Sequence, residues 1–104
     1  MRKELHIDDQ VIPIELSADT PRQYREAFGK DLLVGMMSMK DQLDTEILEN
    51  LAFVMARAAD PELAGVSIHE WLSRFSVMGL YNAAAEILDA WTGNMGTASK
   101  GKKK

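Results

Sequence analysis

The sequence predicts an α+β fold that is mostly α, with an N-terminal β-hairpin followed by four or five short helices. Three observations support this fold class. Apolar and polar residues alternate over residues 3–16, which is the period of a strand with one buried face. From residue 20 onward, apolar residues recur at steps of three and four, which is the period of a helix. Proline, glycine and capping residues divide this helical part into short pieces.

The chain has 104 residues, which is room for one domain with one modest core. Hydrophobic residues make up 46% and charged residues 27%, as in an ordinary folded protein. We therefore expect a single domain over residues 1–95 and a flexible, lysine-rich tail over residues 96–104. We expect no secretory signal and no membrane association, because no stretch approaches the ~20 apolar residues that span a bilayer.

Acidic residues dominate the body of the chain. The formal net charge is −4, but four of the twelve basic residues are the tail lysines Lys100, Lys102, Lys103 and Lys104. The rest of the chain therefore has eight basic against sixteen acidic residues, a net charge of −8. Because nucleic-acid binding relies on a basic face that contacts phosphates, we expect no nucleic-acid partner.

The predicted hairpin covers residues 3–16. Leu5 and Ile7 alternate with polar neighbours, Asp8-Asp9 is a turn signal, and the second strand follows with Pro13 inside it. Proline cannot donate to a strand ladder, so this strand is expected at an edge or a bend. Two strands are not stable alone, so the hairpin must lie on helices or pair with another chain. Its open edge is therefore a candidate contact for a homo-oligomer.

Helices are expected over five ranges: 20–29, 31–39, 44–59, 67–75 and 79–93. Thr20 is the expected N-cap of the first helix, with Pro21 in its first turn, where the missing N–H costs nothing. Gly29 can end that helix as a left-handed cap. Asp31 and Asp44 are expected to begin the next two helices.

The third helix has the clearest apolar face, formed by Ile47, Leu48, Leu51, Met55 and Ala58. Asp60-Pro61 should stop it, since the residue before proline is pushed out of the helical region, and residues 62–66 are expected to form a loop.

Ser67 and Glu70 form a capping pattern for the fourth helix. The fifth helix carries an apolar stripe and is expected to end with Gly93 as its C-cap. The stripe consists of Leu80, Ala84, Ile87, Leu88 and Trp91.

The sequence offers no group of residues for catalysis. His6 and His69 are the only histidines, and neither has a second histidine at helical spacing to share a metal. Turn and capping roles account for the acidic pairs Asp8-Asp9 and Asp41 with Asp44. Cysteine is absent, which excludes disulfides, thiolate nucleophiles and cysteine-bound zinc, and no glycine-rich phosphate loop is present. We therefore expect a protein that is not an enzyme, with no catalytic, cofactor-binding or metal-binding residues.

Methionine is the residue type that stands out. The chain has seven, and Met36, Met37 and Met39 cluster on one short helix. Methionine is flexible and polarizable, so this cluster is a candidate surface for variable protein partners. The alternative is core packing, with Met36 and Met39 on a shared buried face and Met37 pointing elsewhere.

The final helix adds two partner-binding candidates, Leu88 and Trp91. The stripe to which both belong faces either the core or a partner. Trp91 can join Trp71, Phe75 and Tyr81 in one aromatic cluster between the last two helices. Its place near the helix end leaves a second interpretation, an exposed anchor for a partner.

Three stretches resemble the tail assembly chaperone family of siphophages that infect Gram-positive bacteria. They are residues 19–33 (DTPRQYREAFGKDLL), 69–81 (HEWLSRF through Tyr81) and 85–95 (AEILDAWTGNM). With the strands before them and the lysine tail after them, the similarity spans nearly the whole chain. One departure is Ala85, where family members often have proline before the glutamate of the last helix.

The resemblance implies a non-catalytic role in the host bacterial cytoplasm. Members of the family bind the tape measure protein before the tail tube protein polymerises around it. The family is also known for a longer product made by ribosomal slippage near the end of the short reading frame. Gly101-Lys102-Lys103-Lys104 is compatible with slippage, because lysine codons are rich in adenine.

Other function classes remain as alternatives. A structural head–tail or tail component retained in the virion would share the small mixed fold and the edge strand. A small DNA-binding regulator is disfavoured, because the body of the chain is acidic and no helix carries a basic face. An enzyme is the least favoured class.

Overall fold

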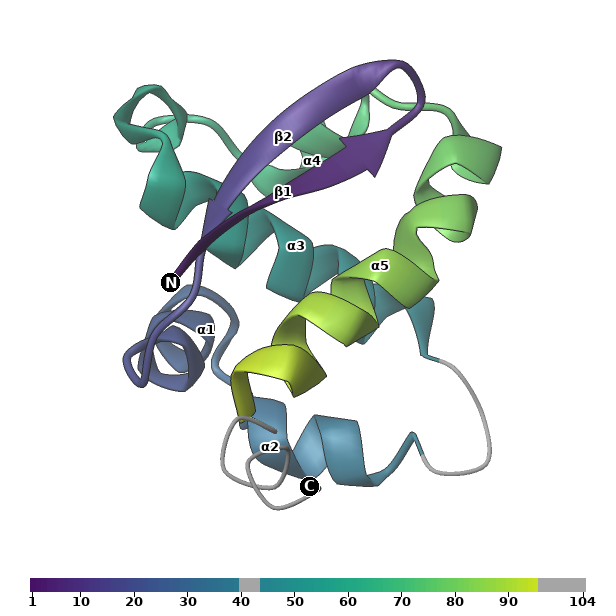
Figure 1. Cartoon of the computed structure of the whole chain (residues 1–104). Helices are drawn as coiled ribbons and strands as arrows, with labels where there is room; N and C mark the ends of the chain where they lie inside the picture. Colours follow the sequence, from purple (N-terminus) through teal and green to yellow (C-terminus); the bar gives the residue numbers. More distant parts are fainter. Residues whose placement is uncertain (40–43, 96–104) are drawn as a thin grey trace.

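The computed structural model describes residues 1–39 and 44–95, with side chains through Thr92. It confirms an α+β fold that is mostly helical, with an N-terminal hairpin and the predicted series of short helices (Figure 1). In chain order the elements are β1 (Arg2–Ile7), β2 (Gln10–Glu15), α1 (Thr20–Phe28), α2 (Leu32–Met37), α3 (Thr45–Ala59), the 3-10 helix η1 (Pro61–Leu63), α4 (Ile68–Leu72) and α5 (Val77–Met95).

The hairpin has the expected two-residue turn at Asp8 and Asp9. Its strands are antiparallel, and Ile7 pairs with Gln10 across the turn. Asp8 has a φ of 56°, a left-handed conformation that aspartate adopts more readily than most residues. Pro13 lies opposite Glu4 in a sheet of two strands, so the edge position predicted for it is confirmed.

The hairpin lies across two helices and contributes to a single core. β2 packs on α3 and β1 packs on α5, while α1 contacts α3 on the side toward the open end of the hairpin (Figure 1). The inward side chains of Leu5, Ile7 and Ile14 are completely buried. α3 is central to this core, with a continuous buried run from Asn50 to Ala56. The alternation of the strands therefore meets the apolar face of α3, as hydrophobic burial requires.

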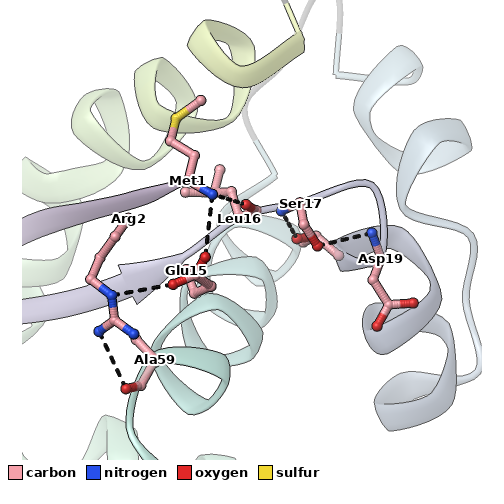
Figure 2. Close-up of polar contacts among 8 residues, drawn as sticks. Met1, Arg2, Glu15, Leu16, Ser17, Asp19 and Ala59 are labelled. Carbon is pink, nitrogen blue, oxygen red and sulfur yellow. Dashed lines mark hydrogen bonds and ion pairs between the residues drawn. The ribbon is translucent and has the colours of Figure 1, made fainter.

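Polar contacts close the open end of the hairpin (Figure 2). The Met1 amino group donates to the Leu16 carbonyl oxygen at 2.7 Å, and the Arg2 guanidinium pairs with the Glu15 carboxylate at 3.2 Å. Arg2 also donates to the carbonyl oxygen of Ala59 at 3.5 Å, a long bond. Ala59 is the last residue of α3, where carbonyl groups lack partners within the helix and attract positive charge.

Most of the predicted helix signals are confirmed. Gly29 caps α1 with a φ of 71°, and Asp31 accepts a hydrogen bond from the Val34 amide at the start of α2. Asp44 accepts hydrogen bonds from the amides of Glu46 and Ile47 at the start of α3. Thr20 is not an N-cap, because it is the first residue of α1 and its buried hydroxyl accepts from the Ser17 amide instead.

Several helix ends differ from the prediction. α2 ends at Met37 instead of residue 39. The expected loop over residues 62–66 overlaps η1, and the Asp60 side chain accepts a hydrogen bond from the Glu62 amide at its start. Ser67 accepts from the Glu70 amide as predicted, but α4 ends at Leu72 and not at residue 75. Asp41 and the tail over residues 96–104 lie outside the described residues.

α5 is longer than predicted at both ends. It begins two residues earlier than residue 79, because the hydroxyl of Ser76 accepts from the Gly79 amide and satisfies one of the free N–H groups of the first turn. The prediction that Gly93 is its C-cap is wrong, since the helix continues to Met95. Glycine inside a helix is tolerated at a cost of about 1 kcal/mol relative to alanine.

Candidate partner-binding groove

An apolar groove lies between α3, α4 and the start of α5. Its volume is about 250 Å³. Leu48 of α3 and Ile87 of α5 are its most buried lining residues. The remaining apolar wall consists of Leu72, Phe75, Val77, Leu80 and Tyr81. Because the groove is open to solvent, an apolar side chain from another polypeptide can reach these residues.

The first two turns of α5 extend apolar surface beyond the core. Val77 is 84% exposed and Tyr81 is 59% exposed, although both line the groove. Residues 77, 80 and 81 are three and four positions apart, so their side chains share one face of the helix. Further along, Ala84 and Ile87 continue this face into the core. An apolar face that continues past the core into solvent is typical of a surface that another protein covers.

One corner of the groove is acidic. Glu49 of α3 lines it and is half-buried, and Thr45 lies one turn before it. Burial raises the pKa of the Glu49 carboxyl, and the nearby charges of Glu46 and Asp44 raise it further. Within the described part of the chain, no basic side chain forms an ion pair with Glu49. The groove thus combines an apolar wall with a carboxylate that forms no ion pair with any described residue.

The hairpin turn holds the first turn of α5 in place. Asp8 accepts a hydrogen bond from the Ser76 amide at 2.8 Å and another from the Ser76 hydroxyl at 2.7 Å. These two hydrogen bonds hold the pKa of Asp8 below its usual value, and the bond from the hydroxyl has the larger effect. Gly79 allows this close approach, because any side chain there would collide with the Asp8 carboxylate. The wall that Val77 and Tyr81 form is therefore fixed to the hairpin.

A second contact joins β1 to the middle of α5. The His6 amide donates to Glu86 at 3.0 Å, and His6 Nδ1 lies 2.8 Å from the other oxygen of that carboxylate. The hydrogen bond and the charge of Glu86 raise the pKa of His6. Burial acts to raise the pKa of Glu86, but the hydrogen bonds and charge of His6 outweigh it and lower that pKa.

The methionine cluster divides as the core-packing alternative predicts. Met36 and Met39 are half-buried and pack against the core. Met37 is 73% exposed, beside the exposed side chains of Leu33 and Val34. α2 therefore offers a second apolar surface, but none of the three methionines lines the groove.

The two candidates from α5 are less accessible than Met37. Leu88 is half-buried against the core, and Trp91 is only 3% exposed, so Trp91 is not an exposed anchor. Its Nε1 atom is buried without a hydrogen-bond partner among the described residues. The predicted aromatic cluster is also wrong in part. Trp71 packs against Phe75 and Phe53 with ring centres 5.0 and 5.5 Å apart, whereas Tyr81 is exposed.

The sequence alone does not predict the groove. Its signal lies in Val77, which extends the stripe of α5 one turn before Leu80, and in Tyr81, which widens the stripe beside Leu80. The sequence pattern does not reveal this extension, because it predicts a helix that begins at residue 79 and places Tyr81 in the aromatic cluster. No sequence pattern indicates Glu49 as a site residue, because its position beside the groove depends on how α3 and α5 pack.

The described residues contain no arrangement suited to metal chemistry. Over residues 1–39 and 44–95, no three histidine or acidic side chains lie close enough together to hold a metal ion. In the same ranges, no helix has the length and apolar content needed to cross a bilayer. No family model, curated protein or solved structure matches the sequence. The resemblance to tail assembly chaperones therefore remains a prediction.

Proposed function

We propose that this protein is a phage tail assembly chaperone, which binds helical segments of the tape measure protein and recruits tail tube subunits in the host cytoplasm. The apolar groove between α3 and α5 is the observation that carries the proposal. It supplies a surface for another polypeptide, and the resemblance supplies the partner. A tape measure protein is long and largely helical, so its apolar faces need cover until the tube forms around it.

The size of the groove favours a polypeptide over a small molecule. Pockets for small ligands usually measure about 300–1,000 Å³. A groove of about 250 Å³ is smaller and suits one or two anchoring side chains of an amphipathic helix. Contacts of this size are weak individually, which would let tube subunits displace the chaperone during assembly.

Co-expression with the tape measure protein from the same locus tests the proposal. The wild-type chain should co-purify with it and raise its soluble yield. Val77→Glu should reduce both effects, because it places a carboxylate on the apolar wall. The fold should be retained, since Val77 is 84% exposed and acidic residues are favourable in the first turn of a helix.

Val34→Glu is the matched control. Val34 is also exposed in a first helical turn, but it lies on α2, away from the groove. Loss of binding in Val34→Glu alone would place the contact on α2 and refute the groove as the binding surface. Absence of binding by the wild-type chain, in both its short form and any frameshifted form, would refute the chaperone function.

The hairpin favours a second candidate, a structural component of the virion. In the described structure the sheet has two strands only, so each strand has one edge without a strand neighbour. Such edges can pair with other copies and build a ring or a homo-oligomer. Mass spectrometry of purified virions separates the two functions. Abundant copies in finished particles would support the structural function, since a chaperone leaves the particle.

A further inference from the structure

The charge beside the groove restricts the kind of helix that fits it. Glu49 is a half-buried carboxylate next to apolar side chains, an environment that disfavours a lone charge. The other half-buried carboxylates among the described residues each have a polar partner: Glu15 pairs with Arg2, Glu86 pairs with His6, and Asp60 accepts a hydrogen bond from the Glu62 amide. Glu49 has none among the described residues, and the charges that raise its pKa are those of the acidic Glu46 and Asp44. A basic group from a partner would supply the missing compensation.

Glu49 is also well placed to meet a bound helix. It belongs to α3 and lines the groove together with Val77 and Tyr81 of α5. A helix that inserts apolar side chains between α3 and α5 therefore has its own flanking positions near this carboxylate. Lysine and arginine can lay their apolar stems along such a wall and bring their charge to the carboxylate.

We infer that the groove selects amphipathic helices with a lysine or arginine beside the apolar face, which would pair with Glu49. This inference rests on the proposed function and narrows it from apolar helices in general to basic ones. A tape measure protein that used this site would carry the motif in each bound segment. Charge complementarity then gives selectivity, and the apolar wall gives most of the affinity.

Two synthetic peptides of roughly 18 residues, long enough to form a helix, provide the test. Both carry leucines at positions i, i+3, i+4 and i+7 on an alanine background. One has lysines beside the leucine face, and the other has glutamates at the same positions. Binding to the full-length chain is measured by fluorescence anisotropy at 0.15 M salt, where exposed charges farther apart than about 8 Å are largely screened.

The lysine peptide should bind the wild-type chain at least about tenfold more tightly than the glutamate peptide. Glu49→Gln should weaken the binding of the lysine peptide by about three- to tenfold, and Glu49→Lys should make the glutamate peptide the tighter binder. Glu4→Lys is the control with the same change of charge. Glu4 is exposed in β1, away from the groove, so the preference should remain.

Other results would refute the selectivity for basic helices. They would not decide the proposed function, which is tested by co-purification with the tape measure protein. Equal binding of both peptides, unchanged in Glu49→Gln, would show a groove that accepts helices without regard to charge. A similar loss of the preference for the lysine peptide in Glu4→Lys and Glu49→Lys would show that the preference depends on the net charge of the protein. Failure of both peptides to bind would refute the groove as a site for helices, whereas the chaperone function depends on co-purification with the tape measure protein.

Discussion

Replacing Gly29 by alanine isolates the cost of one backbone conformation. Gly29 ends α1 with a φ of 71°, and a methyl group added there would meet no atom within 4 Å. No clash or lost side-chain contact therefore enters the result. A non-glycine residue in the left-handed region costs roughly 1–2 kcal/mol. Alanine also restricts the unfolded chain, which offsets about 0.4–1 kcal/mol of that cost. The free energy of unfolding should therefore fall by about 0.8 kcal/mol, the difference between the midpoints of the two ranges.

Gly65 provides the matched control. A methyl group there also meets no atom within 4 Å, but its φ is outside the left-handed region. Gly65→Ala should therefore stabilise the protein by about 0.4–1 kcal/mol through the unfolded state alone. Urea unfolding followed by circular dichroism measures both variants against the wild type. Changes of the same sign at the two positions would refute the reasoning, because only the sign of φ separates them.

Three further predictions concern other contacts. Protonated His6 should stabilise the fold fully below pH 6.5, and this stabilisation is lost as the pH rises through the raised pKa of His6. His6→Gln should remove it, so the melting temperature of the variant should vary less than that of the wild type between about pH 5 and about pH 9. Asp44→Ala should lower the free energy of unfolding by about 1 kcal/mol, measured in urea, because two amides of α3 lose their acceptor. Trp71→Ala should cost about 3–5 kcal/mol in the same assay, with a smaller loss in Trp71→Phe, because the buried ring packs between Phe53 and Phe75.

Local signals predicted the order and type of the elements. The alternation around Leu5 and Ile7, the turn at Asp8-Asp9 and the left-handed cap at Gly29 each depend on neighbouring residues only, and all are confirmed. The predicted helix ends are wrong where a residue distant in the sequence determines the local structure. The start of α5 is set partly by Asp8, which lies 68 positions from Ser76 and binds its amide and hydroxyl. No pattern near residue 76 predicts that contact.

The same division applies to the candidate site. The sequence predicted that Met37 would point away from Met36 and Met39, because helical spacing alone decides which side chains share a face. The groove depends instead on the packing of α3 against α5, which periodicity does not specify. Trp91 is an example. Helical spacing places it on the apolar stripe, but its burial depends on how α5 packs against the rest of the fold.

The attachment of β1 to α5 affects how the protein folds during its synthesis. His6 and Glu86 are 80 positions apart, so the hairpin leaves the ribosome long before the helix that covers it. At roughly 5–20 residues per second, about 4–16 s pass between the translation of the two residues. A two-stranded hairpin is marginal in water, so Leu5 and Ile7 have no lasting cover during this interval. The core is therefore completed only after α5 has been translated, which leaves the nascent chain open to aggregation and to cellular chaperones until α5 docks.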